Sequence, residues 1–146
     1  MNKKRNYLYQ EITDKIWKIL PRLLNDFRRR PGYSEHKKKA ALVNLLKGQE
    51  LAVATEVPII HRYKGTRIGV GFIDLVLDSR VVVEVKNVDE LTAEHMDQLK
   101  RYVEDGGFAL GVLINLGDRS ADIATTEGRK MIFQRYYYAP NDPYRE

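Results

Sequence analysis

Residues 73–86 read Ile-Asp-Leu-Val-Leu-Asp-Ser-Arg-Val-Val-Val-Glu-Val-Lys, and this stretch decides the fold that we expect. Two apolar runs flank the polar triplet at 78–80, which predicts two strands joined by a short turn. The second run is apolar on both faces, as in a central strand that is covered on either side. Alternate residues of a strand point to opposite faces, so one face takes Val81, Val83 and Val85, and the other takes Val82, Glu84 and Lys86.

Charged residues at the end of a buried strand cost desolvation energy unless a cation or a cleft compensates them. A simpler interpretation is that Glu84 and Lys86 pair on an exposed edge, where such ion pairs are common and weak. Asp74 favours a metal site, because a hairpin would bring it beside Glu84, and converging carboxylates repel each other unless a divalent cation lies between them. Lys86 would then orient or activate a water, or stabilise negative charge on a phosphate.

The expected ion is Mg²⁺, with Mn²⁺ as the alternative. The candidate ligands are carboxylates, and no cysteine or histidine cluster lies near them in the sequence. Oxygen ligands of this kind favour magnesium over zinc.

Helices are expected before and after this strand pair in the chain. Apolar residues at steps of three and four predict a helix over residues 7–27, which Pro21 should kink or divide in two. A second helix has Ser34 as its expected N-cap and Gly48 just past its end. A third opens near Thr92 and ends at a pair of glycines.

The order of elements is α-β-β-β-α-β on a mixed sheet. Residues 51–60 and 108–116 predict further strands, 117–128 are expected to form a loop, and 130–138 a last strand or a partner-facing tail. The fold class is α/β with a mixed α+β sheet. We expect one domain over residues 1–146, with a basic helical segment at 1–30 and a core at 31–138.

Composition limits the class of protein. The chain has 146 residues, of which 43% are hydrophobic and 31% charged, as in an ordinary folded domain. It has no cysteine, which excludes disulfides and thiolate metal sites, and a reducing cytoplasm is the expected location. No apolar run approaches the roughly 20 residues of a membrane span, and no secretory signal is expected.

The positive charge is concentrated in the first part of the chain. Residues 1–40 carry 12 Lys and Arg against 4 Asp and Glu, while the whole chain has a net charge of +5. This asymmetry favours a polyanion such as nucleic acid as partner, although a solvated helix surface is an equally good explanation. The residues expected to contact phosphates are Arg28, Arg29, Arg30, Lys37 and Lys38, with Lys39 beside them.

Two helices offer further polar groups to the same cleft. Glu35 lies in the first turn of the second helix, where it either points toward the cleft or only complements the helix dipole. On the third helix, Gln98 and Tyr102 lie one turn apart along a flank of the buried stripe. His95 lies on the same flank, where a satisfied boundary histidine is expected rather than a metal ligand.

These residues resemble a known family. Asp74, the Glu84-Val85-Lys86 triplet and the 98–102 segment Gln-Leu-Lys-Arg-Tyr look like the PD-(D/E)XK nuclease superfamily, whose RecB-like branch has a QxxxY element. More narrowly, Pro31-Gly32-Tyr33-Ser34-Glu35 resembles the GxxExxY family. The resemblance covers about residues 12–135. Two positions depart from the pattern, because Lys38 stands where a tyrosine is expected and Ile73 replaces a proline.

The resemblance implies a restriction-endonuclease-like core with an additional N-terminal helix. It implies that the metal ligands are Asp74, Glu84 and Val85, and that the catalytic set is Glu35, Asp74, Glu84, Lys86, Gln98 and Tyr102. The function it implies is Mg²⁺-dependent hydrolysis of phosphodiester bonds in nucleic acid, with DNA as the expected substrate. A homodimer is compatible with it, because many small nucleases of this type need two sites to cut a duplex.

Two other functions remain open. One is a nucleic-acid-binding module that keeps the fold but does not turn over. The other is a protein-interaction domain, for which the three tyrosines at 136–138 offer an adhesive end. The intact acidic and lysine residues favour the nuclease, but a superfamily implies a fold more safely than an activity.

Overall fold

The computed structural model describes residues 9–117, 120–127 and 130–137, and the side chains of the first of these ranges. Its elements, in chain order, are α1 (Gln10–Arg29), α2 (Glu35–Lys47), β1 (Val53–Tyr63), β2 (Thr66–Leu77), β3 (Val81–Lys86), α3 (Ala93–Gly106), β4 (Leu110–Leu116), β5 (Ser120–Glu127) and β6 (Lys130–Tyr137). The αβββαβ order with an extra N-terminal helix is confirmed, and two further strands follow it.

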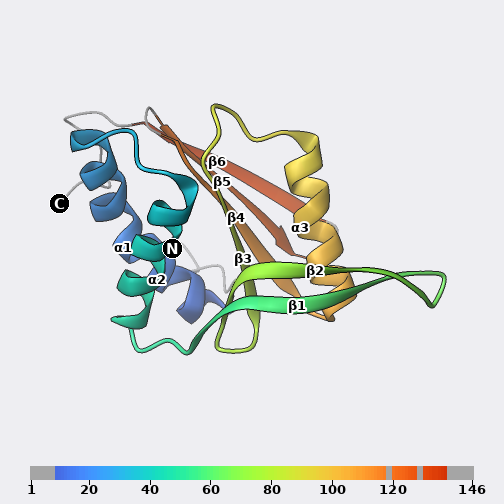
Figure 1. Ribbon diagram of the computed structural model, residues 1–146. Helices are drawn as coiled ribbons and strands as arrows, with labels where there is room; N and C mark the ends of the chain where they lie inside the picture. The colour runs from blue at the N-terminus through green and yellow to red at the C-terminus, as the bar shows by residue number, and fades with distance from the viewer. Residues whose placement is uncertain (1–8, 118–119, 128–129, 138–146) are drawn as a thin grey trace, which may run out of the picture.

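The strands form a mixed sheet whose order is the order of the chain, β1-β2-β3-β4-β5-β6. Neighbouring strands are antiparallel except β3 and β4, which are parallel because α3 carries the chain back across the sheet. Helices α1 and α2 cover one face of the sheet and α3 covers the other (Figure 1). Strand β3 is thus covered on both faces, as its valines predict.

The two faces form two apolar clusters. Helix α1 buries the stripe that begins at Ile12 and ends at Phe27 against the face that carries Val81, Val83 and Val85. Val82 packs on the opposite face with α3, so the predicted alternation of β3 is confirmed. Pro21 lies inside α1, which runs as one helix, so the predicted division does not occur. The apolar stripe continues past the proline, and its packing holds the helix together.

The predicted helix boundaries are found. The Ser34 side chain accepts a hydrogen bond of 3.2 Å from the backbone N–H of Lys37 at the start of α2. Thr92 caps α3 in a capping box whose other member is His95. Gly107 ends α3 with φ 70°, a left-handed conformation that favours glycine. His95 is therefore a capping residue, in keeping with the boundary role expected for it.

The loop expected at 117–128 is wrong, because residues 120–127 form β5 between β4 and β6. The segment is largely polar, a composition that is typical of loops. A polar strand is held here by backbone pairing on both of its edges, which composition does not show. The last strand expected at 130–138 is found as β6 over 130–137, and Tyr138 lies outside the described residues. Within the described ranges, no helix combines the length and apolarity needed to cross a membrane.

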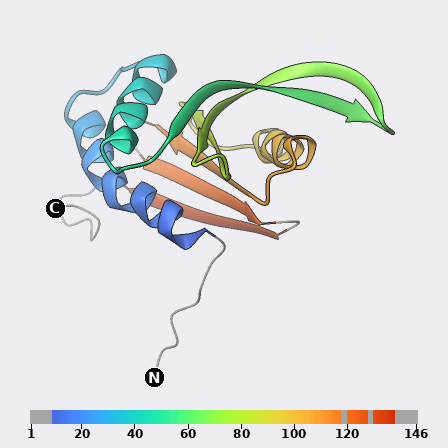
Figure 2. The same cartoon turned by 90° about the horizontal axis from the view of Figure 1, so that it is seen from below.

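Strands β1 and β2 make a long hairpin that leaves the body of the protein. Strand β2 pairs with β3 only from Leu75 to Leu77, so the hairpin beyond that point is a two-stranded ribbon. We call residues 57–73 the arm, and Figures 1 and 2 both show it extending away from α1 and α2. At its tip Lys64 and Gly65 have φ of 47° and 80°, the conformation of a two-residue hairpin turn that matches the twist of the strands.

Candidate active site

The candidate site lies where the side chains of β1 and β2 no longer alternate regularly between the two faces of the sheet. Leu75 packs on the α1–α2 face, whereas Ile73, two residues earlier, packs on the α3 face. Between them stands Asp74, and opposite it on β1 stands Glu56 with a positive φ of 50°. Residues two apart in a regular strand share a face, so both strands are irregular here. The irregularity turns polar side chains out of the sheet beside β3.

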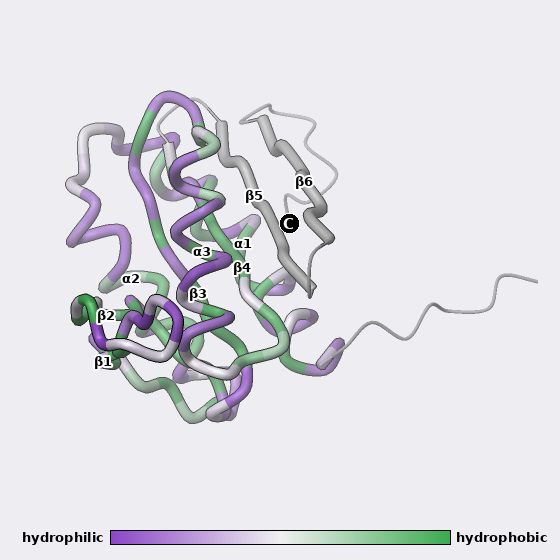
Figure 3. The backbone as a smooth tube through the Cα atoms, turned by 90° about the vertical axis from the view of Figure 1, so that its right-hand side faces the viewer, coloured by the Kyte–Doolittle hydropathy of each residue, from purple (hydrophilic) through white to green (hydrophobic). Residues whose placement is uncertain are grey.

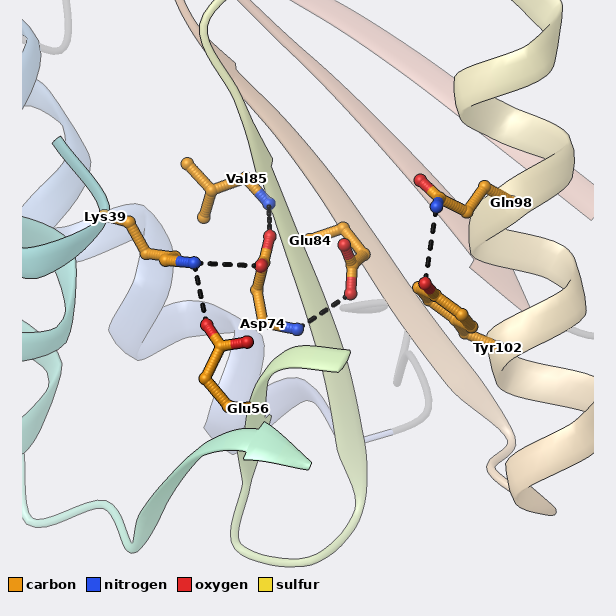
Figure 4. Close-up of polar contacts among 7 residues, drawn as sticks. All are labelled: Lys39, Glu56, Asp74, Glu84, Val85, Gln98 and Tyr102. Atoms are coloured by element: carbon orange, nitrogen blue, oxygen red, sulfur yellow. Dashed lines mark hydrogen bonds and ion pairs between the residues drawn. The ribbon is translucent and has the colours of Figure 1, made fainter. Parts of the chain in front are cut away.

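Asp74 and Glu84 hold each other through their backbones. The backbone N–H of Asp74 donates to Oε1 of Glu84 over 2.9 Å, and the backbone N–H of Val85 donates to Oδ2 of Asp74 over 2.9 Å (Figure 4). Each carboxylate is thus fixed by the strand that carries the other. The structure therefore brings together the two acidic residues that the sequence pattern paired.

Glu84 is a buried carboxyl group, with only 4% of its surface exposed. Burial and the neighbouring charge of Asp74 raise its pKa from 4.5 to about 8, and nearby Lys86 offsets only part of this effect. A carboxylate in such surroundings lacks sufficient positive charge nearby. A bound cation would supply it, and this favours the site as a place for a metal ion.

Sequence reasoning missed a role for Lys39 and Glu56 in this site. The ammonium group of Lys39 lies 3.1 Å from Oδ1 of Asp74 and 2.9 Å from Oε1 of Glu56. Burial alone would lower the pKa of Lys39, but the contacts with Glu56 and Asp74 raise it overall. The signal in the sequence is weak, because only the irregular backbone at residue 56 brings Glu56 to α2.

Helix α3 supplies the opposite wall of the site, as Figure 4 shows. Nε2 of Gln98 donates to the hydroxyl of Tyr102 over 3.3 Å. The Tyr102 ring stacks on His61 of β1 with 5.4 Å between centroids, and Nδ1 of His61 lies 2.7 Å from Asp105. Burial and the charge of Glu84 raise the pKa of Tyr102. The predicted Gln98–Tyr102 pair therefore lies beside Glu84, and His61 was not predicted.

Lys86 is half-buried at the end of β3, in register with Asn115 of the parallel strand β4. Its charge acts on Glu84. Asn115 is buried and exchanges two hydrogen bonds with the backbone of Val88, of 3.0 and 2.9 Å. These bonds hold the chain that follows Lys86, so the end of β3 is a fixed platform.

Glu35 is exposed in the first turn of α2, and in the described part of the chain no hydrogen bond or ion pair joins it to Asp74 or Glu84. Its position agrees with the simpler interpretation, in which it complements the helix dipole. Lys39, one turn further along α2, is the residue that reaches the site from this helix.

Lys38 is wrongly expected to contact nucleic acid, because its side chain is 0% exposed. Its ammonium group donates to Oδ1 of Asn87 and to the backbone carbonyl of Leu116, and it lies 5.3 Å from the centre of the Phe27 ring. A buried cation satisfied in this way joins α2 to the ends of β3 and β4. It is not available to a phosphate at the surface.

The other basic residues of the expected phosphate contacts lie near the junction of α1 and α2. Arg29, Arg30 and Lys37 are exposed and line a hollow of about 490 Å³ together with Tyr33, and Arg28 is half-buried nearby in the last turn of α1. This junction and the tip of the arm lie at opposite ends of the molecule (Figures 1 and 2). The two basic regions are therefore separate surfaces.

The donors fit a magnesium-like ion with few protein ligands. Asp74 and Glu84 supply carboxylate oxygens. The backbone N–H of Val85 donates to Asp74, so the group of Val85 that could bind a metal is its carbonyl oxygen. Among the described residues no group of three or more His, Cys, Asp or Glu side chains could hold a metal. Mg²⁺ is commonly held by one or two carboxylates, with water and substrate phosphate completing its shell. The pair fits that pattern.

A family model described as the PD-(D/E)XK nuclease superfamily matches residues 10–126. The match includes α1, the site and the arm. The narrower resemblance to the GxxExxY family stays a prediction.

No curated protein matches the chain. Among solved structures, the crystal structure of SSO0001 is similar over 97% of this chain and 72% of that chain. The identity is 16% and the TM-score is 0.46.

Proposed function

The chain belongs to the PD-(D/E)XK nuclease superfamily, and on this premise we propose that it is a Mg²⁺-dependent nuclease that hydrolyses phosphodiester bonds in DNA. The site residues are Asp74, Glu84 and Lys86. One observation carries the proposal: Asp74 and Glu84 are held together, each by the other's strand, beside the strand end that carries Lys86.

The ion would be held by the carboxylates of Asp74 and Glu84 and the carbonyl oxygen of Val85. When bound, it supplies a Lewis acid for the phosphate and a water of lowered pKa. In the reaction a water oxygen bonds to phosphorus, the bond from phosphorus to the leaving sugar oxygen breaks, and that oxygen takes up a proton. Every other part of the task falls to the side chains around the pair.

Lys86 is proposed to act on the phosphate. Its ammonium group, at the end of a rigid strand, stabilises the negative charge that develops on the phosphate oxygens. Lys39 is a positioning residue, because its contacts with Asp74 and Glu56 orient the Asp74 carboxylate. Gln98 and Tyr102, joined by a hydrogen bond, form the wall of the site across from Lys39.

The test is cleavage of labelled DNA and RNA, each in single- and double-stranded form, with Mg²⁺ or Mn²⁺ and with EDTA. We expect cleavage of DNA that needs the metal. Asp74→Ala and Lys86→Ala should each abolish it, whereas Asp97→Asn, which removes an exposed carboxylate of α3, should keep it.

Cleavage that persists in both variants would come from another site or a contaminant and would overturn the mechanism. Binding without cleavage of any form would instead indicate a silent module of the same fold. Circular dichroism of each variant shows whether a loss of cleavage reflects chemistry or unfolding.

A further inference from the structure

The arm exposes apolar side chains on one of its faces. Among the described residues, every large hydrophobic side chain that is exposed lies in the arm: Ile60, Tyr63, Ile68, Val70 and Phe72. Pro58 faces Phe72 across the hairpin and Ile60 faces Val70, so these pairs form a strip. Phe72 is 55% exposed and Ile68, at a bulge in the ladder, is 66% exposed. Exposed apolar surface of this kind marks an interaction site.

All Asp, Glu, Lys and Arg positions of the arm carry a basic residue. Residues 57–73 contain Arg62, Lys64 and Arg67 and no Asp or Glu. Arg62 and Arg67 are direct partners across the hairpin. Like charges in directly opposed positions destabilise a strand pair, and a polyanion would remove that cost. Charge thus points to an anionic partner at the tip.

The other face of the arm is fixed to the body of the protein. Ile59 packs against α3, and His61 stacks on Tyr102. Gly71 permits this contact, because a Cβ there would lie 2.7 Å from Nε2 of His61 and 2.9 Å from Cε1 of Tyr102. The arm is therefore held in place from one side and open on the other. Figure 3, which looks at the arm from its tip, shows hydrophobic and hydrophilic residues side by side along it.

We propose that the arm is a double-stranded DNA-binding element that enters the major groove and leads the duplex to Asp74. This inference rests on the proposed function and names its substrate. A two-stranded ribbon fits the major groove of B-form DNA, which is about 12 Å wide. The basic tip contacts phosphates at the groove edge, while the apolar strip meets sugars and base methyl groups.

The arm is long enough for a duplex bound along it to reach the site. Seven residues separate Glu56 from the end of β1, a distance of roughly 23 Å at about 3.3 Å per residue. A duplex gripped along the arm thus runs toward the carboxylates at its base. A-form RNA has a deep and narrow major groove that the ribbon cannot enter, so duplex RNA is excluded as the preferred partner.

A second copy of the chain is the less suitable occupant of this surface. A two-fold interface repeats the same patch on both subunits. Two arms packed in that way would bring Arg62, Lys64 and Arg67 of each copy near one another without an acidic residue of either arm to balance them.

The first experiment compares two variants with the same loss of charge. One carries Arg62→Gln, Lys64→Gln and Arg67→Gln in the arm, and the other carries Lys15→Gln, Lys18→Gln and Arg22→Gln on α1, where none of the expected phosphate contacts lies. Binding to a fluorescent 20-base-pair DNA is measured by anisotropy in EDTA over a range of salt. We expect the arm variant to lose at least tenfold in affinity. The slope of log K against log salt should fall by about 2.7, at about 0.9 per phosphate contact.

The α1 variant should change the slope by less than about 1, one third of the value for three contacts. An arm variant that binds within twofold of wild type, or an α1 variant that loses as much, overturns the proposal. Equal or tighter binding of duplex RNA or single-stranded DNA overturns the proposal that the arm binds in the major groove of double-stranded DNA. Because these are binding measurements in EDTA, they remain decisive if the protein proves not to cleave.

A second experiment addresses the apolar strip. Val70→Ser with Phe72→Ser should weaken DNA binding at least threefold and leave the mass in sedimentation equilibrium unchanged. If the mass falls from dimer to monomer and DNA binding stays the same, the strip is an interface between copies and the proposal is wrong. In cleavage assays, the arm variant should lose activity on duplex DNA at low concentration and recover it at high concentration, whereas Asp74→Ala should not recover.

Discussion

The two halves of the β1–β2 hairpin are built from similar sequences and differ in what surrounds them. The inner half, where Leu75 and Leu77 are 0% exposed, belongs to the sheet and lies under α1 and α2. The outer half, the arm, also carries aliphatic and aromatic residues, yet it exposes Phe72 and Val70. The change from one to the other occurs at Glu56 and Asp74, where both strands are irregular.

The difference teaches that apolar strand residues do not by themselves define a core. The inner half is stabilised by burial, and the arm is held by α3 on one side only. Polar groups collect at the boundary, because there the sheet loses its regular ladder while burial is still high. The candidate active site lies at that boundary.

Asp74→Ala gives the largest expected effect, because it acts at the boundary itself. We expect a loss of about 10³-fold or more in cleavage rate, equivalent to about 4 kcal/mol in the barrier. Duplex DNA binding through the arm should stay within threefold. The measurement pairs single-turnover cleavage with anisotropy, and a parallel loss of binding would show that boundary and arm are not independent.

Leu75→Ala and Phe72→Ala compare the inner half with the arm directly. The first leaves a cavity in the core and should lower the free energy of unfolding by about 2–5 kcal/mol. The second removes a largely exposed ring and should cost under about 0.5 kcal/mol. Urea denaturation measures both. Similar costs would mean that the arm is packed as tightly as the inner half.

The pH dependence of stability tests the buried carboxyl group beside the boundary. Since the pKa of Glu84 is raised to about 8 from 4.5, the folded protein keeps a proton that the unfolded chain releases. Stability from this group is full below pH 4.5 and is lost as pH rises through about 8. The free energy of unfolding in EDTA should fall across this window by a few kcal/mol, roughly.

Glu84→Gln should remove that slope, and Asp97→Asn, with an exposed carboxylate, should retain it. Thermal unfolding at intervals from pH 5 to 8.5 gives the comparison. A slope that is the same in Glu84→Gln and in the wild type would mean that Glu84 is ionised in the folded protein across the whole range.

Gly71→Ala tests how the arm is held to the body. The new methyl group would collide with His61 and Tyr102, and we expect a loss of about 1–3 kcal/mol in stability. Gly69→Ala is the matched control on the same strand, because a Cβ there meets nothing within 4 Å. Equal effects of the two substitutions in urea denaturation would show that the arm is not seated on α3.

Lys39→Met should have only a small effect on stability. The lysine and its partners are partly exposed, so solvent screens the pair and the loss should be under about 1 kcal/mol. Lys47→Met, at an exposed position in the last turn of the same helix, is the control. The informative measurement is cleavage, where Lys39→Met should lower kcat with little change in KM. A change in KM alone would place Lys39 in binding rather than in positioning Asp74.

The order of elements could be predicted from the sequence up to β4. The 3.6-residue period of α1, the capping residues Ser34 and Thr92, and the valine run of β3 all depend on local physics, which a sequence displays. The same local pattern placed Asp74 beside Glu84. Strand β5 was missed because its hydrogen bonds come from neighbours on both sides, and backbone pairing is nearly independent of side-chain polarity.

The parts of the site that the sequence hid are those that depend on the irregular backbone. Glu56 contacts Lys39 at a point where β1 takes a positive φ, an irregularity that the sequence signals only through Pro58, two residues further on. Lys38 and Lys39 are adjacent in the chain, yet one is buried among Asn87 and Leu116 while the other faces the acidic pair. The two side chains leave α2 in different directions, and a run of lysines in the sequence does not show this difference.

The order of the sheet has a consequence for how the chain folds. In the described sheet each strand pairs with the strand next to it in sequence, and the parallel step from β3 to β4 is bridged by α3. Such pairing keeps the loops to be closed short, which favours rapid folding. Strands can add one at a time as the chain leaves the ribosome, each onto an edge already formed. Helices α1 and α2 precede the sheet in the chain but have no sheet to cover until β3 and β4 exist, so we expect them to dock after strands that follow them in sequence.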